Sequence, residues 1–218
     1  MTIVHGKDYP NNISVVKVSK SGSIRNISVE GVDEMKGSYY SHRGVNKQYT
    51  MRQEKRPSAE AKKHAEDMLW DENTLRCFVD ASELDFQGIF GFGACFISNG
   101  TVIVKNKKHY RQDMRKKNSY AELMAVIFAL EQLEMLLDKK SFTPSKFLLY
   151  SDWQGVEDID NPTKNKETNA LRKRINELRD RLLKTNNLEL EIAVMDKEFK
   201  RSNPFYQSAH NQARKILR

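Results

Sequence analysis

One short stretch constrains the fold of this chain more than any other. Residues 75–80 combine strand-forming side chains with a terminal Asp80, and a segment rich in glycine and aromatic residues follows. A carboxylate at the end of a buried strand needs an ion-pair partner, hydrogen bonds or a metal ion, because an isolated charge in an apolar setting costs several kcal/mol. We therefore expect Asp80 to belong to a functional site.

The composition is typical of a soluble globular protein. Of the 218 residues, 39% are hydrophobic and 30% are charged, which allows one domain with a full core plus about 70 further residues. No apolar run approaches the roughly 20 residues of a membrane span, and residues 1–7 lack the apolar segment of a signal peptide. We expect no membrane association and a cytoplasmic location. The net charge of +8 favours a polyanionic partner.

The two cysteines, Cys77 and Cys95, lie in apolar runs typical of strands. This setting favours small buried hydrophobic side chains over a disulfide or a metal-binding pair. A reducing compartment fits that interpretation.

From residue 74 onward, the predicted elements follow an order typical of an α/β fold. Alternating side chains predict three strands with short connections, including the turn Asn99-Gly100, and an apolar stripe predicts a helix from Ser119. The predicted strands cover 75–80, 88–97, 101–104, 146–152 and 188–194, and two later helices cover about 167–184 and about 204–217. This order predicts a five-stranded mixed sheet, an antiparallel meander plus two parallel strands, flanked by helices.

Residues 1–73 form a small N-terminal extension to the domain predicted over residues 74–218. Alternation over 13–18 and 24–29 predicts a β-hairpin, residues 37–56 have the composition of a linker, and a helix is expected from Pro57 or Ser58 to about Trp70. The residues of the extension indicate no function.

Three acidic residues are expected to converge at one edge of the predicted sheet. The carboxyl ends of parallel strands lie together, so Asp80 and Asp152 would be neighbours, and Glu122 would join them if its helix begins beside those ends. Three carboxylates without balancing cations repel one another, which favours a cage for divalent metal. Oxygen ligands select Mg²⁺ or Mn²⁺, and two such ions could clamp a phosphodiester.

Each acid could instead have a purely structural role. Asp80 could cap a turn, and Asp152 could cap the helix that follows it. Glu122 could form a capping box with Ser119. The joint pattern, in this order of elements, favours the metal site.

Three motifs together resemble the type 1 ribonuclease H family. They are Phe-Val-Asp-Ala-Ser at 78–82 with glycines at 88, 91 and 93, Asn-Ser-Tyr-Ala-Glu-Leu at 118–123, and Tyr-Ser-Asp at 150–152. The resemblance covers about residues 74–218. It implies a metal-dependent endonuclease that cleaves the RNA strand of RNA–DNA hybrids, with Asp80, Glu122 and Asp152 as ligands of two Mg²⁺ ions and Asp80 bridging both.

The last helix departs from the family pattern. His210 stands where active members have a fourth acidic residue, and we include it as a candidate catalytic residue and metal ligand. Imidazole binds Mn²⁺ better than Mg²⁺, although His210 could also be a polar residue without that role. Residues 195–201 replace the histidine-containing loop of active members, and Asp196 or Glu198 could supply the missing charge.

Basic residues could hold a nucleic acid through its phosphates. Seven of them lie within 105–117, before the helix that carries Glu122, and others line the later helix, although a charge run is also typical of a solvated surface. The resemblance adds Asn118, which would touch the hybrid backbone near a ribose hydroxyl. The candidate nucleic-acid contacts are Ser82, Lys116, Lys117, Asn118, Arg172 and Arg174.

Three hypotheses follow for the function. The leading one is an endonuclease that hydrolyses RNA in RNA–DNA hybrids by a two-metal mechanism. The alternative is a catalytically weak or inactive module that binds nucleic acid and whose metal site has decayed at His210. A third is a related nuclease for DNA junctions or single strands, because one fold can host several activities.

Overall fold

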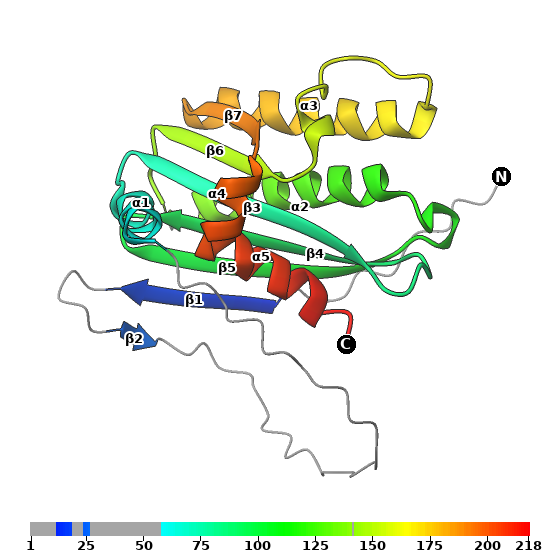
Figure 1. Ribbon diagram of the computed structural model, residues 1–218. Coiled ribbons are helices and arrows are strands. Elements are labelled where there is room, and N and C mark those ends of the chain that lie inside the picture. Colours follow the sequence, from blue (N-terminus) through cyan, green and yellow to red (C-terminus); the bar gives the residue numbers. More distant parts are fainter. Residues whose placement is uncertain (1–11, 19–23, 27–57, 141) are drawn as a thin grey trace, which may run out of the picture.

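A single mixed sheet forms the centre of the molecule. The computed structural model describes residues 12–18, 24–26, 58–140 and 142–218, and the strand order within them is β2-β1-β5-β4-β3-β6-β7 (Figure 1). The strands are β1 (Asn12–Val18), β2 (Ile24–Asn26), β3 (Thr74–Glu83), β4 (Ile89–Ser98), β5 (Thr101–Tyr110), β6 (Lys146–Ser151) and β7 (Glu189–Val194).

The strand pairing confirms the predicted five-stranded arrangement. β3 pairs with β4, and β4 with β5, in antiparallel ladders, whereas β3 with β6 and β6 with β7 are parallel pairs. β1 and β2 form the predicted hairpin, and β1 also pairs with β5, so the hairpin extends the sheet. The predicted linker 37–56 and the hairpin residues 27–29 lie outside the described residues.

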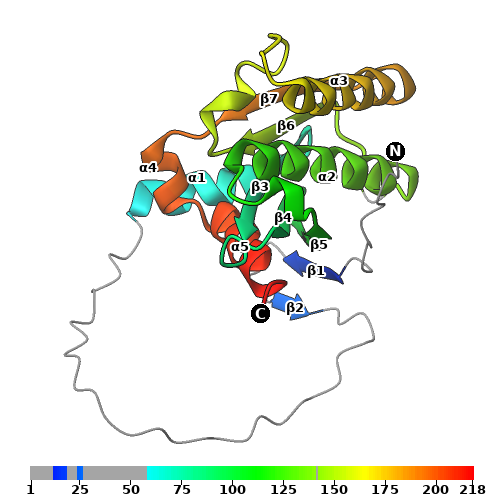
Figure 2. The ribbon, with the colours of Figure 1, turned by 90° about the vertical axis from the view of Figure 1, so that its right-hand side faces the viewer.

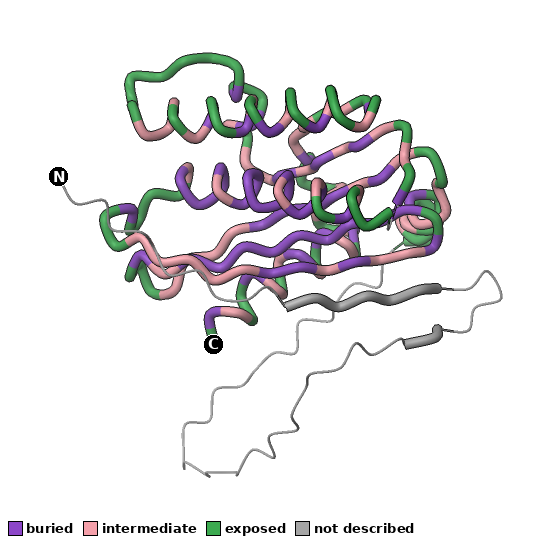
Figure 3. Tube along the Cα trace, turned by 180° about the vertical axis from the view of Figure 1, so that it is seen from behind, coloured by how far each residue is buried: buried purple, intermediate pink, exposed green. Residues whose placement is uncertain are grey.

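Helices cover both faces of the sheet. They are α1 (Ala59–Trp70), α2 (Asn118–Asp138), α3 (Lys166–Asn186), α4 (Lys197–Ser202) and α5 (Pro204–Lys215), with short 3₁₀ turns at Gln112–Met114 and Gln154–Val156. α2 and α3 lie on one face, and α1, α4 and α5 on the other (Figures 1 and 2). Buried residues concentrate in the central strands and α2 (Figure 3).

Two strands continue beyond their predicted ends. β3 does not stop at Asp80, because its ladder with β4 continues to the pair Glu83–Phe90. β5 does not stop at Val104, because it pairs with β4 as far as Tyr110. The first half of the basic segment is therefore strand, and Lys105 is buried within it. Polar side chains concealed these extensions, since backbone pairing rather than apolar alternation defines them.

Two glycines of β4 let α5 approach the sheet. A Cβ atom at Gly91 or Gly93 would run into the backbone carbonyl of Ala213 or Ala209 on that helix. The glycine spacing therefore fixes how closely α5 packs on β4, and with it the position of the side chains that α5 presents to the carboxyl end of β3.

The core contains both cysteines. Cys77 and Cys95 are fully buried and form no disulfide, as the sequence predicted. Burial raises the pKa of both thiols, which keeps them protonated and unreactive. No helix in the described ranges has the length and apolarity that a membrane span requires.

Candidate acidic site

The parallel pairing of β3 and β6 places Asp80 next to Asp152. Their ladder ends at the pair Phe78–Tyr150, and two more residues along each strand reach the two aspartates. Asp80 is buried inside the longer antiparallel ladder with β4, whereas Asp152 directly follows β6. The two acids are therefore neighbours at one edge of the parallel part of the sheet, as predicted.

The hydroxyl of Tyr206 bridges the two aspartates. It lies 2.8 Å from Oδ1 of Asp80 and 3.0 Å from Oδ2 of Asp152. A tyrosine hydroxyl has one proton, so it donates to one carboxylate at a time. Burial and the neighbouring negative charge of Asp80 raise the pKa of Tyr206, so this side chain remains a donor. Its position follows from the start of α5, where Asn203 caps the backbone N–H groups of Phe205 and Tyr206.

His210 lies one turn further along α5 and contacts the other oxygen of Asp80. Its Nδ1 is 3.0 Å from Oδ2 of that residue, and its ring stacks on Tyr206 with centroids 6.1 Å apart. Burial raises the pKa of Asp80, while the Tyr206 hydroxyl and His210 act against that shift. The structure thus brings His210 to the acidic site, and metal binding by it stays a prediction.

Lys200 of α4 forms an ion pair with Asp152. Its Nζ also lies 5.1 Å from the centre of the Tyr206 ring. Asp196 caps α4 by accepting from the backbone N–H groups of Glu198 and Phe199, and a role of Asp196 or Glu198 as the replacement acid stays a prediction. Residues 195–201 thus contribute a cation to the acidic cluster.

Glu122 is the most isolated of the three acids. This residue is only 6% exposed, and its Oε2 atom has no hydrogen-bond partner among the described residues. Burial, with added repulsion from Asp152 and Asp80, raises the pKa of this carboxyl to about 9. An orphaned carboxylate oxygen beside two further acids is the arrangement that a divalent cation would relieve.

The capping interpretations of the three acids are wrong. α2 begins at Asn118 with Lys117 as its N-cap residue, and no side chain caps it, so Glu122 is not part of a capping box. Asp152 accepts hydrogen bonds from Tyr206 and Lys200, and Asp80 lies in a regular ladder. Tyr206 connects Asp80 with Asp152, and the charges of both acids act on Glu122.

A pH-dependent stability follows from the buried carboxyl of Glu122. The folded chain keeps this proton up to a pH of about 9 and the unfolded chain only to about 4.5, so the free energy of unfolding falls as pH rises between these values. The Glu122→Gln variant has no carboxyl group at this position, so its free energy of unfolding lacks this decrease with pH. We expect its melting temperature to exceed that of the wild type by an amount that grows from about pH 5 to about pH 8.5, measured with a chelator present.

The matched control for that experiment is Glu157→Gln, which removes the same charge from an exposed position. Its melting temperature should follow the wild type at both pH values, within about 0.5 kcal/mol of stability. A difference between Glu122→Gln and the wild type that does not change with pH would contradict the buried, protonated carboxyl.

The residues predicted to contact nucleic acid lie in different parts of the structure. Glu83 accepts hydrogen bonds from the backbone N–H groups of Gly88 and Lys116, at 2.9 and 3.0 Å, which holds the loop before α2 against the end of β3. Ser82, Lys116, Lys117 and Asn118 therefore come from adjacent segments. Lys116 also lies 5.9 Å from the ring centre of the exposed Phe86. Arg174 on α3 pairs with Glu131 of α2.

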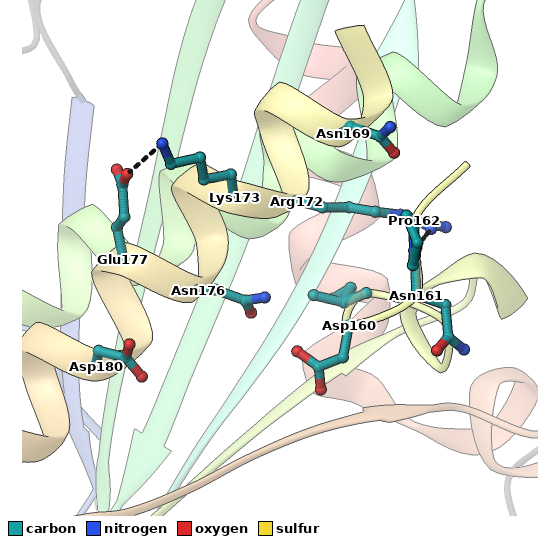
Figure 4. Close-up of a pocket in the computed structure, with 10 residues that line it drawn as sticks. Asp160, Asn161, Pro162, Asn169, Arg172, Lys173, Asn176, Glu177 and Asp180 are labelled. Carbon is teal, nitrogen blue, oxygen red and sulfur yellow. Dashed lines mark hydrogen bonds and ion pairs between the residues drawn. The ribbon is translucent and has the colours of Figure 1, made fainter. Parts of the chain in front are cut away.

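Arg172 lines a surface hollow and is largely buried there. It is buried between α3 and the loop that contains Asn161, whose backbone carbonyl it contacts (Figure 4). The hollow there has a volume of about 350 Å³ and also exposes Lys173 and Glu177, which form an ion pair. The nucleic-acid contact at Arg172 stays a prediction. Its burial was not expected from the sequence, because periodicity shows that a residue is on a helix but not which loop covers it.

Sequence reasoning missed Tyr206 and Lys200. Tyr206 stands four residues before His210, so the two side chains share one helical face, and that spacing could have identified it. Lys200 is 48 residues from Asp152 in the chain and has no motif around it, so only the tertiary structure reveals the pair.

The fold and the acidic site together define the class. Strands β5-β4-β3-β6-β7 form a mixed sheet with helices on both faces, which is a ribonuclease H-like fold. Asp80 and Asp152 are neighbours on its parallel strands, and their charges reach Glu122 of α2. No family model matches the sequence, and no curated protein matches it.

Solved structures provide the comparison. Ribonuclease H1 from the halophilic archaeon Halobacterium salinarum has 19% identity and a TM-score of 0.50, over 66% of this chain and 98% of that one. The N-terminal ribonuclease H domain of a Mycobacterium tuberculosis protein has 14% identity and a TM-score of 0.49, over 66% and 94%. A ribonuclease H1 isolated from compost, in complex with an RNA/DNA hybrid, has 17% identity and a TM-score of 0.47, over 66% and 99%. The first of these establishes the fold.

Proposed function

We propose that this protein is a metal-dependent endonuclease that hydrolyses the RNA strand of RNA–DNA hybrids. The proposal depends on the arrangement of three acids. One tyrosine hydroxyl joins Asp80 and Asp152, and their charges act on Glu122, whose buried Oε2 has no hydrogen-bond partner among the described residues. The ribonuclease H-like fold supports it, and so does the net charge of +8, which favours a polyanionic substrate. The similar structure from Halobacterium salinarum is a ribonuclease H1.

The donor set fits a hard divalent cation such as Mg²⁺ or Mn²⁺. Carboxylate oxygens are the ligands that both ions prefer, and Asp80 and Glu122 are the candidate ligands with the largest desolvation to relieve. No three acidic, histidine or cysteine side chains within the described ranges already form a metal cage, so binding requires Glu122 or the Lys200 contact to adjust. When bound, a divalent cation supplies Lewis-acid chemistry for phosphodiester hydrolysis.

The protein residues have separable tasks in this proposal. Tyr206 holds Asp80 and Asp152 at a fixed spacing, and His210 orients the second oxygen of Asp80. Burial of Asp80 and Glu122 excludes bulk water from their carboxylates. Basic side chains in the loop before α2, including Lys116 and Lys117, would hold phosphates without sequence preference.

A strand-specific cleavage assay tests the function. An RNA–DNA hybrid labelled on either strand is incubated at low salt with Mg²⁺ or Mn²⁺, next to duplex DNA, duplex RNA and single strands of the same sequence. We expect metal-dependent cutting of the RNA strand in the hybrid, with 3′ hydroxyl and 5′ phosphate ends, and no cutting with a chelator.

Other outcomes select other functions. Binding of the hybrid without cutting under any metal condition would contradict the nuclease and favour a nucleic-acid-binding module. Cutting of single strands or DNA junctions instead of the hybrid would contradict the substrate, because the same fold and metal site can serve those activities.

A further inference from the structure

The short helix α4 carries a cation into the acidic site. Asp196 fixes its start through bonds of 2.9 and 2.8 Å to two backbone N–H groups. Phe199 anchors its other side on the sheet, with ring centres 6.0 Å from Phe78 and 5.6 Å from Tyr150. Lys200 follows directly after this anchor, so its ammonium group is positioned by the packing of the helix rather than by the ion pair alone.

The Lys200 ammonium has two partners in the site. It pairs with Oδ2 of Asp152, the oxygen that Tyr206 also contacts, and it lies 5.1 Å from the centre of the Tyr206 ring. Each contact favours a positive charge at this place. A divalent cation that used the same oxygen of Asp152 would have to displace the ammonium group or lie against a like charge.

Among the described residues, no lysine or arginine forms a hydrogen bond or ion pair with Asp80 or Glu122, and the charge of Lys200 acts on Glu122 only through space. The ε-carboxylate of Glu122 has an oxygen without a partner in the described part of the chain, and Asp80 contacts only the neutral hydroxyl of Tyr206 and the ring of His210 among the hydrogen-bonding side chains found there. The ammonium group is therefore bonded to Asp152, whereas Glu122 and Asp80 have no direct ion pair with a lysine or arginine in the described part of the chain.

We propose that Lys200 takes the place of one of the two expected metal ions, so that the site binds a single divalent cation through Asp80 and Glu122. This inference rests on the proposed function, because it assumes that the three acids bind metal at all. It revises the expected number of ions from two to one and assigns the second positive charge to the protein itself. Lys200 and Tyr206 then hold the carboxylate of Asp152 in place.

Counting bound ions tests the proposal. Full-length chain is titrated with Mn²⁺ by isothermal titration calorimetry, and the Mn²⁺ bound at saturation is also counted by electron paramagnetic resonance. We expect one ion per chain in the wild type and in Lys200→Arg, which keeps the charge. Lys200→Met keeps an apolar stem of similar length without the charge, and we expect it to bind two ions.

The matched control is Arg201→Met, which removes a positive charge from an exposed position of the same helix. It should bind one ion like the wild type. Thermal unfolding of each variant verifies that it is folded. If Lys200→Met does not fold, Lys200→Gln serves as a second neutral variant.

The outcomes separate this inference from the nuclease proposal. Two ions in the wild type, together with hybrid cleavage, would overturn the role of Lys200 and leave the nuclease intact. One ion in the wild type and also in both neutral variants would overturn it as well, because Lys200 would not set the number. No bound ion in any variant, together with no hybrid cleavage, would overturn both proposals.

Discussion

Replacement of Asp80 by asparagine is expected to reduce hybrid cleavage more than about 100-fold, since loss of residues that only support a metal ligand already costs about 10- to 100-fold. Asp80 has a partner on each carboxyl oxygen, Tyr206 on one and His210 on the other. The Asp80→Asn side chain has the same shape, so the loss would reflect the missing charge. Single-turnover cleavage of the labelled hybrid measures the effect.

The stability of the same variant is the control. Burial raises the pKa of Asp80, which means that the folded chain carries this charge at a cost in free energy, so the amide should leave the melting temperature unchanged or raise it. Binding of Mn²⁺ should raise the melting temperature of the wild type and not that of Asp80→Asn. Full activity of Asp80→Asn, or loss of activity through unfolding alone, would contradict the assignment.

The substitution Gly93→Ala is expected to destabilise the fold by about 1–3 kcal/mol, the usual range for overpacking, or by more if α5 cannot shift. The added Cβ atom would meet the backbone carbonyl of Ala209, and a backbone atom cannot rotate away as the end of a side chain can. Any shift of α5 also carries Tyr206 and His210 away from Asp80, so cleavage should fall in the molecules that remain folded. Urea denaturation measures the first effect.

A lower denaturation midpoint at an unchanged slope would show a change in stability rather than in the unfolded state. The control is Gln207→Ala, an exposed exchange on the same helix, which should change stability by less than about 0.5 kcal/mol. A Gly93→Ala variant as stable and as active as the wild type would mean that the contact between β4 and α5 is looser than the structure has it.

The two predictions test different parts of one arrangement. Asp80→Asn removes a functional group and leaves the packing intact, whereas Gly93→Ala moves the packing and leaves every functional group in the chain. If both lose activity but only the second loses stability, the site depends on α5 for position and on Asp80 for chemistry.

Local sequence patterns determined which elements form and which acids could meet. The apolar runs before Asp80 and Asp152 predicted two strands, and the strand-helix order predicted their parallel pairing, which brought both acids to one edge of the sheet. The buried cysteines and the start of α1 near Ser58 also followed from local pattern. These features depend on residues that are close in the chain, and hydrophobic periodicity indicates such local structure reliably.

Only the tertiary structure decided what surrounds the acids. Tyr206 is 126 residues from Asp80, and Lys200 is 48 from Asp152, so no local pattern connects them. The burial of Arg172 under a loop likewise depends on packing between distant segments. The sequence alone predicted that Asp80 and Asp152 would be neighbours, and that Glu122 would join them if its helix began beside those strand ends. The packing of α4 and α5 on the sheet decided which hydroxyl, imidazole and ammonium groups contact the aspartates. Such long-range contacts depend on how the surfaces of helices and sheet fit together, and the local order of residues does not reveal this fit.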